Sequence, residues 1–179
     1  MRILVHVCCA PCFTYPHKRL LEEGHDVTAF FFNPNIHPYL EFKNRLESLE
    51  KYEKVKGIEI IYNKEYDLVK FLRGALDATE RCDFCYKYRL SEVARIAVQL
   101  GFEAFTTTLL ISPYQKHEKL AKTGQETGKE YGIEFFYEDF RKGYGESREI
   151  ARSMGLYMQK YCGCIFSEKE RYLRERENQ

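Results

Sequence analysis

Short apolar segments alternate along this chain with longer segments of helical periodicity, and this alternation constrains the fold more than any other feature. The apolar segments have the length of buried strands, about four to eight residues, and turn residues bound them. We predict strands at residues 2–7, 25–32, 58–62, 103–110 and 133–137. We predict helices at residues 14–23, 39–56, 66–72, 87–100 and 116–131, near Arg148, and from Ser167 onwards.

Strands that alternate with helices form a parallel sheet covered on both faces. Right-handed crossovers make 3-2-1-4-5 the expected strand order. The predicted fold class is therefore α/β: a Rossmann-like three-layer sandwich with a mostly parallel five-stranded sheet and a cysteine-rich site at the strand carboxyl ends. We expect residues 1–179 to form a single catalytic domain.

Two groups of polar residues fall where such a sheet binds its ligands. In doubly wound sheets, ligands lie beyond the carboxyl ends of the strands, at the point where the strand order reverses. Here that point lies between the first and fourth strands. Cys8 and Cys9 follow the first strand, and Thr106–Thr108 and Ser112 surround the end of the fourth. Topology and cysteine placement thus predict the same site.

The composition sets few limits on partners. A net charge of +1, from 28 Lys+Arg and 27 Asp+Glu, neither requires nor excludes a nucleic acid. The amino terminus has a short apolar run and no small-residue cleavage site, so we expect no signal peptide. No stretch approaches the roughly 18–20 apolar residues of a membrane span. We therefore expect a cytoplasmic protein with reduced thiols and no membrane association.

The seven cysteines fall into three tight groups. Thiols clustered in this way, in a chain without a secretory signal, indicate metal ligands or redox groups rather than a disulfide framework. The turn after the first strand, C-C-A-P-C, lacks the glycines that let backbone amides reach phosphate, which disfavours a dinucleotide or ATP there. The groups are Cys8/Cys9/Cys12, Cys82/Cys85 and Cys162/Cys164.

The first two groups together can supply a tetrathiolate site. A zinc ion, an iron–sulfur cluster and dithiol redox chemistry all fit four such thiols, and the spacing leaves the three open. The adjacent pair Cys8/Cys9 tilts the choice slightly away from zinc, because structural zinc favours a C-x₂₋₄-C knuckle around one small ion. Cys12 is either a buried inert thiol or one with a lowered pKa at a helix start.

The third group, Cys162-Gly163-Cys164, is a separate signal. A disulfide across one glycine would be strained and easily reduced, which suits a redox pair that cycles. The alternative is that both thiols bind metal or line a pocket.

Acid–base and phosphate-binding candidates are fewer. His37 lies in the turn Asn33–Pro38 and is a candidate for proton transfer. Asp83, inside the C-x-x-C, and Asp139 are candidate acids or oxygen ligands. A basic stretch surrounds the C-G-C and suits phosphate contact. It comprises Arg141, Lys142, Arg148, Arg152 and Lys160.

Six motifs in order resemble the epoxyqueuosine reductases of the QueH type, and the match runs from the first strand to Ser167. They are His6–Cys12 (HVCCAPC), Asn33–Pro38 (NPNIHP), Arg81–Cys85 (RCDFC), Thr106–Ser112 (TTTLLIS), Asp139–Gly143 (DFRKG) and Tyr161–Cys164 (YCGC).

The resemblance implies an oxidoreductase of tRNA processing that performs the last step of queuosine biosynthesis, the reduction of the epoxide of epoxyqueuosine at the tRNA wobble position. It also implies a 4Fe-4S cluster on Cys8, Cys9, Cys82 and Cys85, and a redox-active, disulfide-forming pair, Cys162/Cys164. A second, mononuclear iron would draw its ligands from Cys12, Cys162, Cys164 and Asp83. The implied partners are tRNA carrying epoxyqueuosine in its anticodon loop and an electron donor protein, with no use of ATP.

Two other functions fit the same residues. A zinc-stabilised RNA-binding module would keep the cysteines and need no reductant. A dithiol–disulfide oxidoreductase would need only Cys162 and Cys164.

Overall fold

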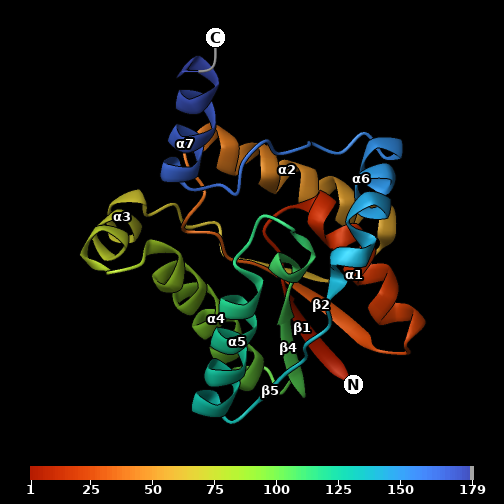
Figure 1. Ribbon diagram of the computed structural model, residues 1–179. Helices are drawn as coiled ribbons and strands as arrows, with labels where there is room; N and C mark the ends of the chain where they lie inside the picture. Colours follow the sequence, from red (N-terminus) through yellow and green to blue (C-terminus); the bar gives the residue numbers. More distant parts are fainter. Residues whose placement is uncertain (178–179) are drawn as a thin grey trace.

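A five-stranded parallel sheet forms the centre of the molecule (Figure 1). The computed structural model describes the backbone of residues 1–177 and the side chains of residues 1–173, so the last two residues of the predicted domain lie outside the described residues. The strand order β3-β2-β1-β4-β5 confirms the predicted fold class. The strands are β1 (Arg2–His6), β2 (Asp26–Phe31), β3 (Ile60–Tyr62), β4 (Ala104–Thr107) and β5 (Glu134–Phe135).

Helices cover both faces of the sheet. On one face α1 packs against α6, α2 and β2, and on the other α4 packs against α5, α3, β1 and β4 (Figure 1). Right-handed crossovers from β1 run outward in two directions, which puts the connecting helices on opposite faces. The helices are α1 (Ala10–Glu22), α2 (Tyr39–Lys56), α3 (Leu68–Asp77), α4 (Arg81–Gln99), α5 (His117–Tyr131), α6 (Tyr144–Ser153) and α7 (Ile165–Glu177).

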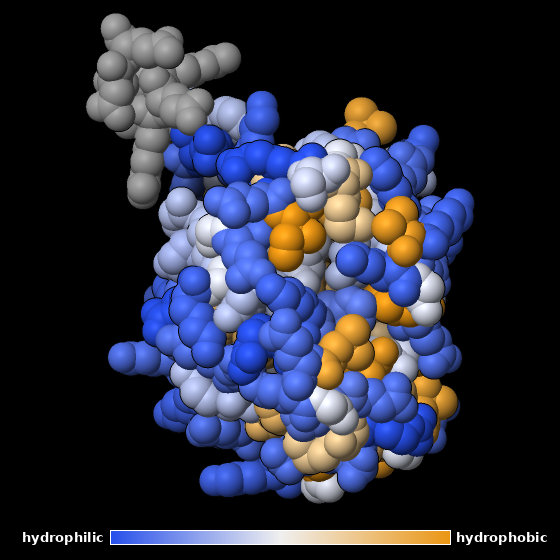
Figure 2. Space-filling view, turned by 90° about the vertical axis from the view of Figure 1, so that its right-hand side faces the viewer, coloured by the Kyte–Doolittle hydropathy of each residue, from blue (hydrophilic) through white to orange (hydrophobic). Residues whose placement is uncertain are grey.

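The core lies along the central strand. Ile3, Leu4 and Val5 of β1 have no exposed surface, as expected for a parallel strand with helices on both sides. On the face drawn in Figure 2, hydrophilic residues dominate and hydrophobic ones occur in small separate groups. None of the helices formed by the described residues is long and apolar enough to cross a membrane.

Two element boundaries differ from the prediction in ways that matter for the site. α1 begins at Ala10 rather than residue 14, because Pro11 suits the first turn of a helix, where its missing N–H is not needed. α4 begins at Arg81 rather than residue 87, so the C-x-x-C lies inside the helix and not ahead of it. Cys12 therefore lies in the first turn of α1, and Cys82 and Cys85 lie near the start of α4.

The fourth strand is also shorter than predicted. It ends at Thr107, whose hydroxyl accepts a hydrogen bond from the backbone N–H of Leu109 at 3.2 Å. That contact opens the 3-10 turn η1 (Thr108–Ile111), and a second such turn, η2 (Phe140–Gly143), precedes α6. Residues 108–110, which were predicted as the end of this strand, therefore lie in the 3-10 turn beside Cys8.

His17 is a core histidine whose titration should be visible in the stability of the protein. It is 4% exposed, its Nδ1 lies 2.9 Å from the Tyr52 hydroxyl, and its ring stacks on Phe13. Burial, and then the nearby charge of Lys56, lower the pKa of His17 from 6.5 to about 4. Between these values the unfolded chain binds more protons than the folded one, so stability falls as the pH drops.

We therefore expect the free energy of unfolding to decrease from about pH 6.5 to 4, and to decrease less in a His17→Gln variant. Urea denaturation of both proteins at several pH values across this window measures the difference. Parallel curves for the two proteins would contradict a neutral, buried His17.

Candidate active site

A cavity of about 1080 Å³ opens at the carboxyl edge of the sheet, where the order of the strands reverses. Its walls come from the segments after β1 and β4, the α3–α4 connection, α6 and residues 158–171. This volume is in the range of small-molecule sites. Five cysteines line it: Cys8, Cys12, Cys82, Cys162 and Cys164.

Three buried thiols form one side of the site. The sulfurs of Cys8, Cys9 and Cys12 all lie within 4.8 Å of one another, a spacing that could hold a metal ion. Cys9 is the residue that caps the start of α1, and Cys12 lies in its first turn, so the turn of the chain after β1 brings the three together. The early start of α1 therefore makes Cys12 part of this thiol group.

The pKa values of these thiols are driven apart by their contacts. Hydrogen bonds from Cys12 and Cys9 hold the pKa of Cys8 well below its usual value, and the Thr108 hydroxyl also contacts the Cys8 sulfur at 3.5 Å. Burial raises the pKa of Cys9, and the bond to Cys8 raises that of Cys12. Cys8 is the thiol of this group that most readily carries negative charge.

A buried arginine contacts the C-x-x-C, and its charge also lowers the pKa of Cys8. Arg89 lies one turn after Cys85 on α4, is 2% exposed, and its guanidinium contacts the Cys85 sulfur at 3.8 Å. The same group donates to Asn33 at 3.1 Å and to the ring of His6 at 3.3 Å. Burial lowers the pKa of His6 to about 3, so His6 stays neutral beside the cation.

Arg89 indicates that the thiol site is anionic. Among the described side chains, no carboxylate lies within ion-pair distance of Arg89, although the residue is buried. A buried cation without a counter-charge is destabilising by several kcal/mol, about 3–5 kcal/mol when one partner of a pair is removed. Thiolates that hold a metal or a cluster would supply the missing negative charge. The donor set and its surroundings thus fit a metal–thiolate group.

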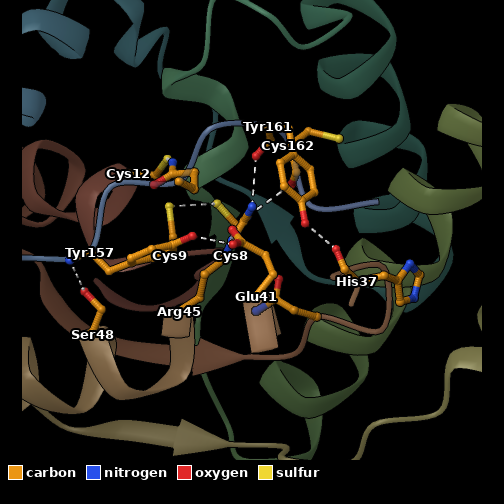
Figure 3. A network of polar contacts seen from close by, with 12 residues as sticks. Cys8, Cys9, Cys12, His37, Glu41, Arg45, Ser48, Tyr157, Tyr161 and Cys162 are labelled. Carbon is orange, nitrogen blue, oxygen red and sulfur yellow. Dashed lines mark hydrogen bonds and ion pairs between the residues drawn. The ribbon is translucent and has the colours of Figure 1, made fainter. Parts of the chain in front are cut away.

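The C-G-C segment is fixed against α2 by a network of polar contacts (Figure 3). Arg45 donates to the carbonyls of Tyr161 at 2.9 Å and Cys162 at 3.1 Å, and its Nε pairs with Glu41 at 2.7 Å. The His37 N–H donates to the Gly163 carbonyl at 2.7 Å, and the Tyr161 hydroxyl donates to the His37 carbonyl. These contacts hold the backbone of the segment, and so they fix where Cys162 and Cys164 lie in the wall of the cavity.

Gly163 is required by this arrangement. Its φ is +125°, in the region that favours glycine, and a Cβ there would lie 2.9 Å from Cγ1 of Ile36 and 3.3 Å from the guanidinium of Arg45. A side chain at this position would push the segment away from α2. The glycine between the two cysteines is therefore a packing requirement as well as a spacer.

The two C-G-C thiols differ in acidity. The hydrogen bond from Cys164 lowers the pKa of Cys162 to about 5, and the Ser167 hydroxyl, 3.0 Å from its sulfur, acts in the same direction. The same contact raises the pKa of Cys164. An asymmetric pair of this kind has one thiolate and one protonated thiol, which is the arrangement that suits thiol–disulfide exchange.

The structure places five of the seven cysteines in the wall of one cavity, while Cys9 and Cys85 do not line it. Among the described residues, the sulfurs close enough to hold one metal ion together are those of Cys8, Cys9 and Cys12.

None of the three predicted acids lines the cavity, and Asp139 forms an ion pair with Arg141 at 2.6 Å. Asp83 forms an ion pair with Lys119 at 2.9 Å and does not line the cavity. His37 is 1% exposed, and its Nε2 donates to the Pro34 carbonyl at 3.0 Å. Their roles in proton transfer stay predictions. The contacts of His37 with Gly163 and Tyr161 are made by its backbone and not by its ring.

Sequence reasoning missed three residues that contact the sulfurs or their segment. Neither Arg45 nor Arg89 belongs to a recognised motif. The one sequence signal for a buried role is that each is a charged residue among apolar ones on a predicted helix. Gln159, in the irregular segment before the C-G-C, donates its amide to the Cys12 sulfur at 3.1 Å. Such a contact, across 147 positions of the chain, has no local signature.

The family model and the curated relatives that match this chain name the same family. The family model described as "Epoxyqueuosine reductase QueH" matches residues 3–170. A Dehalococcoides mccartyi protein named epoxyqueuosine reductase QueH is 38% identical over 96% of this chain and 94% of its own. One from Thermotoga maritima with the same name is 35% identical over 94% and 91%. A solved structure of the teicoplanin deacetylase Orf2 resembles the chain with a TM-score of 0.44 at 10% identity, over 74% of this chain and 65% of its own, which supports no functional comparison.

Proposed function

Because the chain belongs to the epoxyqueuosine reductase QueH family of oxidoreductases, we propose that it reduces the epoxide of epoxyqueuosine to the alkene of queuosine at the wobble position of tRNA. The reaction takes up two electrons and two protons. Both carbon–oxygen bonds of the epoxide break, a carbon–carbon double bond forms, and the oxygen leaves as water.

The observation that carries this proposal is the convergence of all three cysteine groups at one cavity. We assign Cys8, Cys9, Cys82 and Cys85 to a 4Fe-4S cluster, a group that supplies one electron at a time when bound. Arg89 contributes the positive charge that a buried anionic group of this kind requires. The candidate ligands of a second iron are Cys12, Cys162, Cys164 and Asp83, and the three cysteines line the cavity whereas Asp83 does not.

The C-G-C pair provides the second redox centre. Oxidation of two thiols to a disulfide releases two electrons and two protons, which matches the demand of the epoxide. The thiolate of Cys162 and the protonated Cys164 line the same cavity, and Arg45 holds the backbone that carries them. We further propose a separate electron donor protein, no use of ATP, no membrane partner and a cytoplasmic location.

Protein purified without oxygen is expected to be brown, to absorb broadly near about 400 nm and to contain about four sulfides per chain. It should convert tRNA that carries epoxyqueuosine when a chemical reductant is supplied. Iron in excess of sulfide would indicate the second metal. A colourless protein with one zinc would instead favour the RNA-binding module, and turnover that survives Cys82→Ser would favour a dithiol oxidoreductase.

A further inference from the structure

Helix α6 presents a stripe of one aromatic and two basic residues to the cavity. Tyr144, Arg148 and Arg152 are spaced four residues apart, so they lie on one face of the helix, and all three line the cavity. The Cα atoms of the two arginines are thus about 6 Å apart along the helix axis. Lys160, on the segment after α6, lines the same cavity.

The cations of this stripe have no carboxylate partners. Among the side chains of residues 1–173, Arg152 and Lys160 form no ion pair, and the guanidinium of Arg148 lies over the ring of Tyr144 at 5.8 Å. Three other cations that line the cavity are each paired with a carboxylate: Arg45 with Glu41, Arg81 with Glu170 and Lys116 with Glu80. The positive charge of the stripe and of Lys160 is not offset in this way.

Tyr114 stands at the mouth of the cavity next to this stripe. It is 83% exposed, and its ring meets that of Tyr144 edge-on, with centroids 6.2 Å apart and an interplanar angle of 79°. Its backbone N–H donates to the Ser112 hydroxyl at 3.3 Å, which fixes the turn after η1. An aromatic ring this exposed buries little surface in the fold, and its face is accessible to a ligand.

We propose that Tyr114 stacks on an unpaired base beside the nucleoside that enters the cavity, while Arg148, Arg152 and Lys160 bind the phosphates of the same strand. The inference rests on the proposed function and names the surface on which the RNA lies. Aromatic stacking combined with a basic track is the general mode of binding single-stranded RNA, since only unstacked bases offer a free face. A duplex RNA offers phosphates to the basic residues, but its stacked bases offer no free face to the ring of Tyr114.

The two parts of this surface predict different changes in binding. Affinity for an unmodified anticodon stem-loop RNA is measured by fluorescence anisotropy, with anaerobic protein, at several salt concentrations. Tyr114→Ala is expected to weaken binding about tenfold with an unchanged salt slope, and Tyr114→Phe should bind like the wild type. Arg152→Gln should reduce the slope of log affinity against log salt by about 0.7.

Controls come from residues of the same types that do not line the cavity. Tyr137→Ala, at a tyrosine that is 45% exposed, and Lys122→Gln, on the exposed side of α5, should leave affinity and slope unchanged. Equal binding by wild type and Tyr114→Ala would overturn the stacking role, and so would equal affinity for a duplex RNA of the same length. Because the readout is binding without turnover, this failure is separate from a failure of the proposed reaction.

Discussion

Replacing either Cys8 or Cys85 by serine is expected to remove the absorbance near about 400 nm and to lower turnover of epoxyqueuosine-containing tRNA by more than about a hundredfold. The two residues come from different cysteine groups, one after β1 and one on α4. Loss of residues that merely orient metal ligands costs about 10–100-fold, and loss of a ligand itself should cost more. Iron and sulfide content, spectrum and turnover are measured on the same anaerobic samples.

A packing control distinguishes ligand loss from damage to the fold. Val93→Ala removes two methyl groups from a fully buried position of α4 and leaves every sulfur in place. This variant should lose stability but keep its cluster and its turnover per cluster. A Cys85→Ser protein that kept full turnover without a cluster would refute the proposed role of these four cysteines.

The sequence predicted the parts of the molecule that depend on local pattern. The strand order followed from the alternation of apolar runs and helices, and the location of the site followed from cysteines placed after the first strand. Helix starts were less accurate, because Cys82 and Cys85 look like loop residues until α4 is seen to begin at Arg81. The contacts of Arg89 depend on α4 packing across β1, which no local pattern reports.

His37 illustrates a different limit. Its place in a polar turn predicts a side chain that transfers protons, and that role stays a prediction. The structure adds a role that the sequence did not indicate, because the backbone N–H and carbonyl of His37 bond Gly163 and Tyr161. Sequence motifs indicate which residues are unusual, but they do not distinguish a functional side chain from a functional backbone. Here the turn acts as a support for the cysteine pair.

Arg45 also holds the C-G-C segment in place. Replacing Arg45 by methionine is expected to lower the free energy of unfolding by about 3–5 kcal/mol. The side chain of Arg45 is 1% exposed and that of Glu41 is 7% exposed. Without the cation, the Glu41 carboxylate stays buried and, among the described side chains, keeps the Tyr157 hydroxyl as its remaining partner. The carbonyls of Tyr161 and Cys162 also lose their donor. Urea denaturation measures the loss.

A double variant separates the buried charge from the fixing of the segment. Arg45→Met combined with Glu41→Leu removes both charges, so much of the lost stability should return. The carbonyls of Tyr161 and Cys162 still lack a donor, so turnover should stay low and the amide of His37, which donates to Gly163, should exchange its hydrogen faster than in the wild type. Arg95→Met, at an exposed arginine paired with Glu92, should change stability by less than about 1 kcal/mol. If the double variant recovered full turnover, Arg45 would act through the charge it balances and not through the two carbonyls it holds.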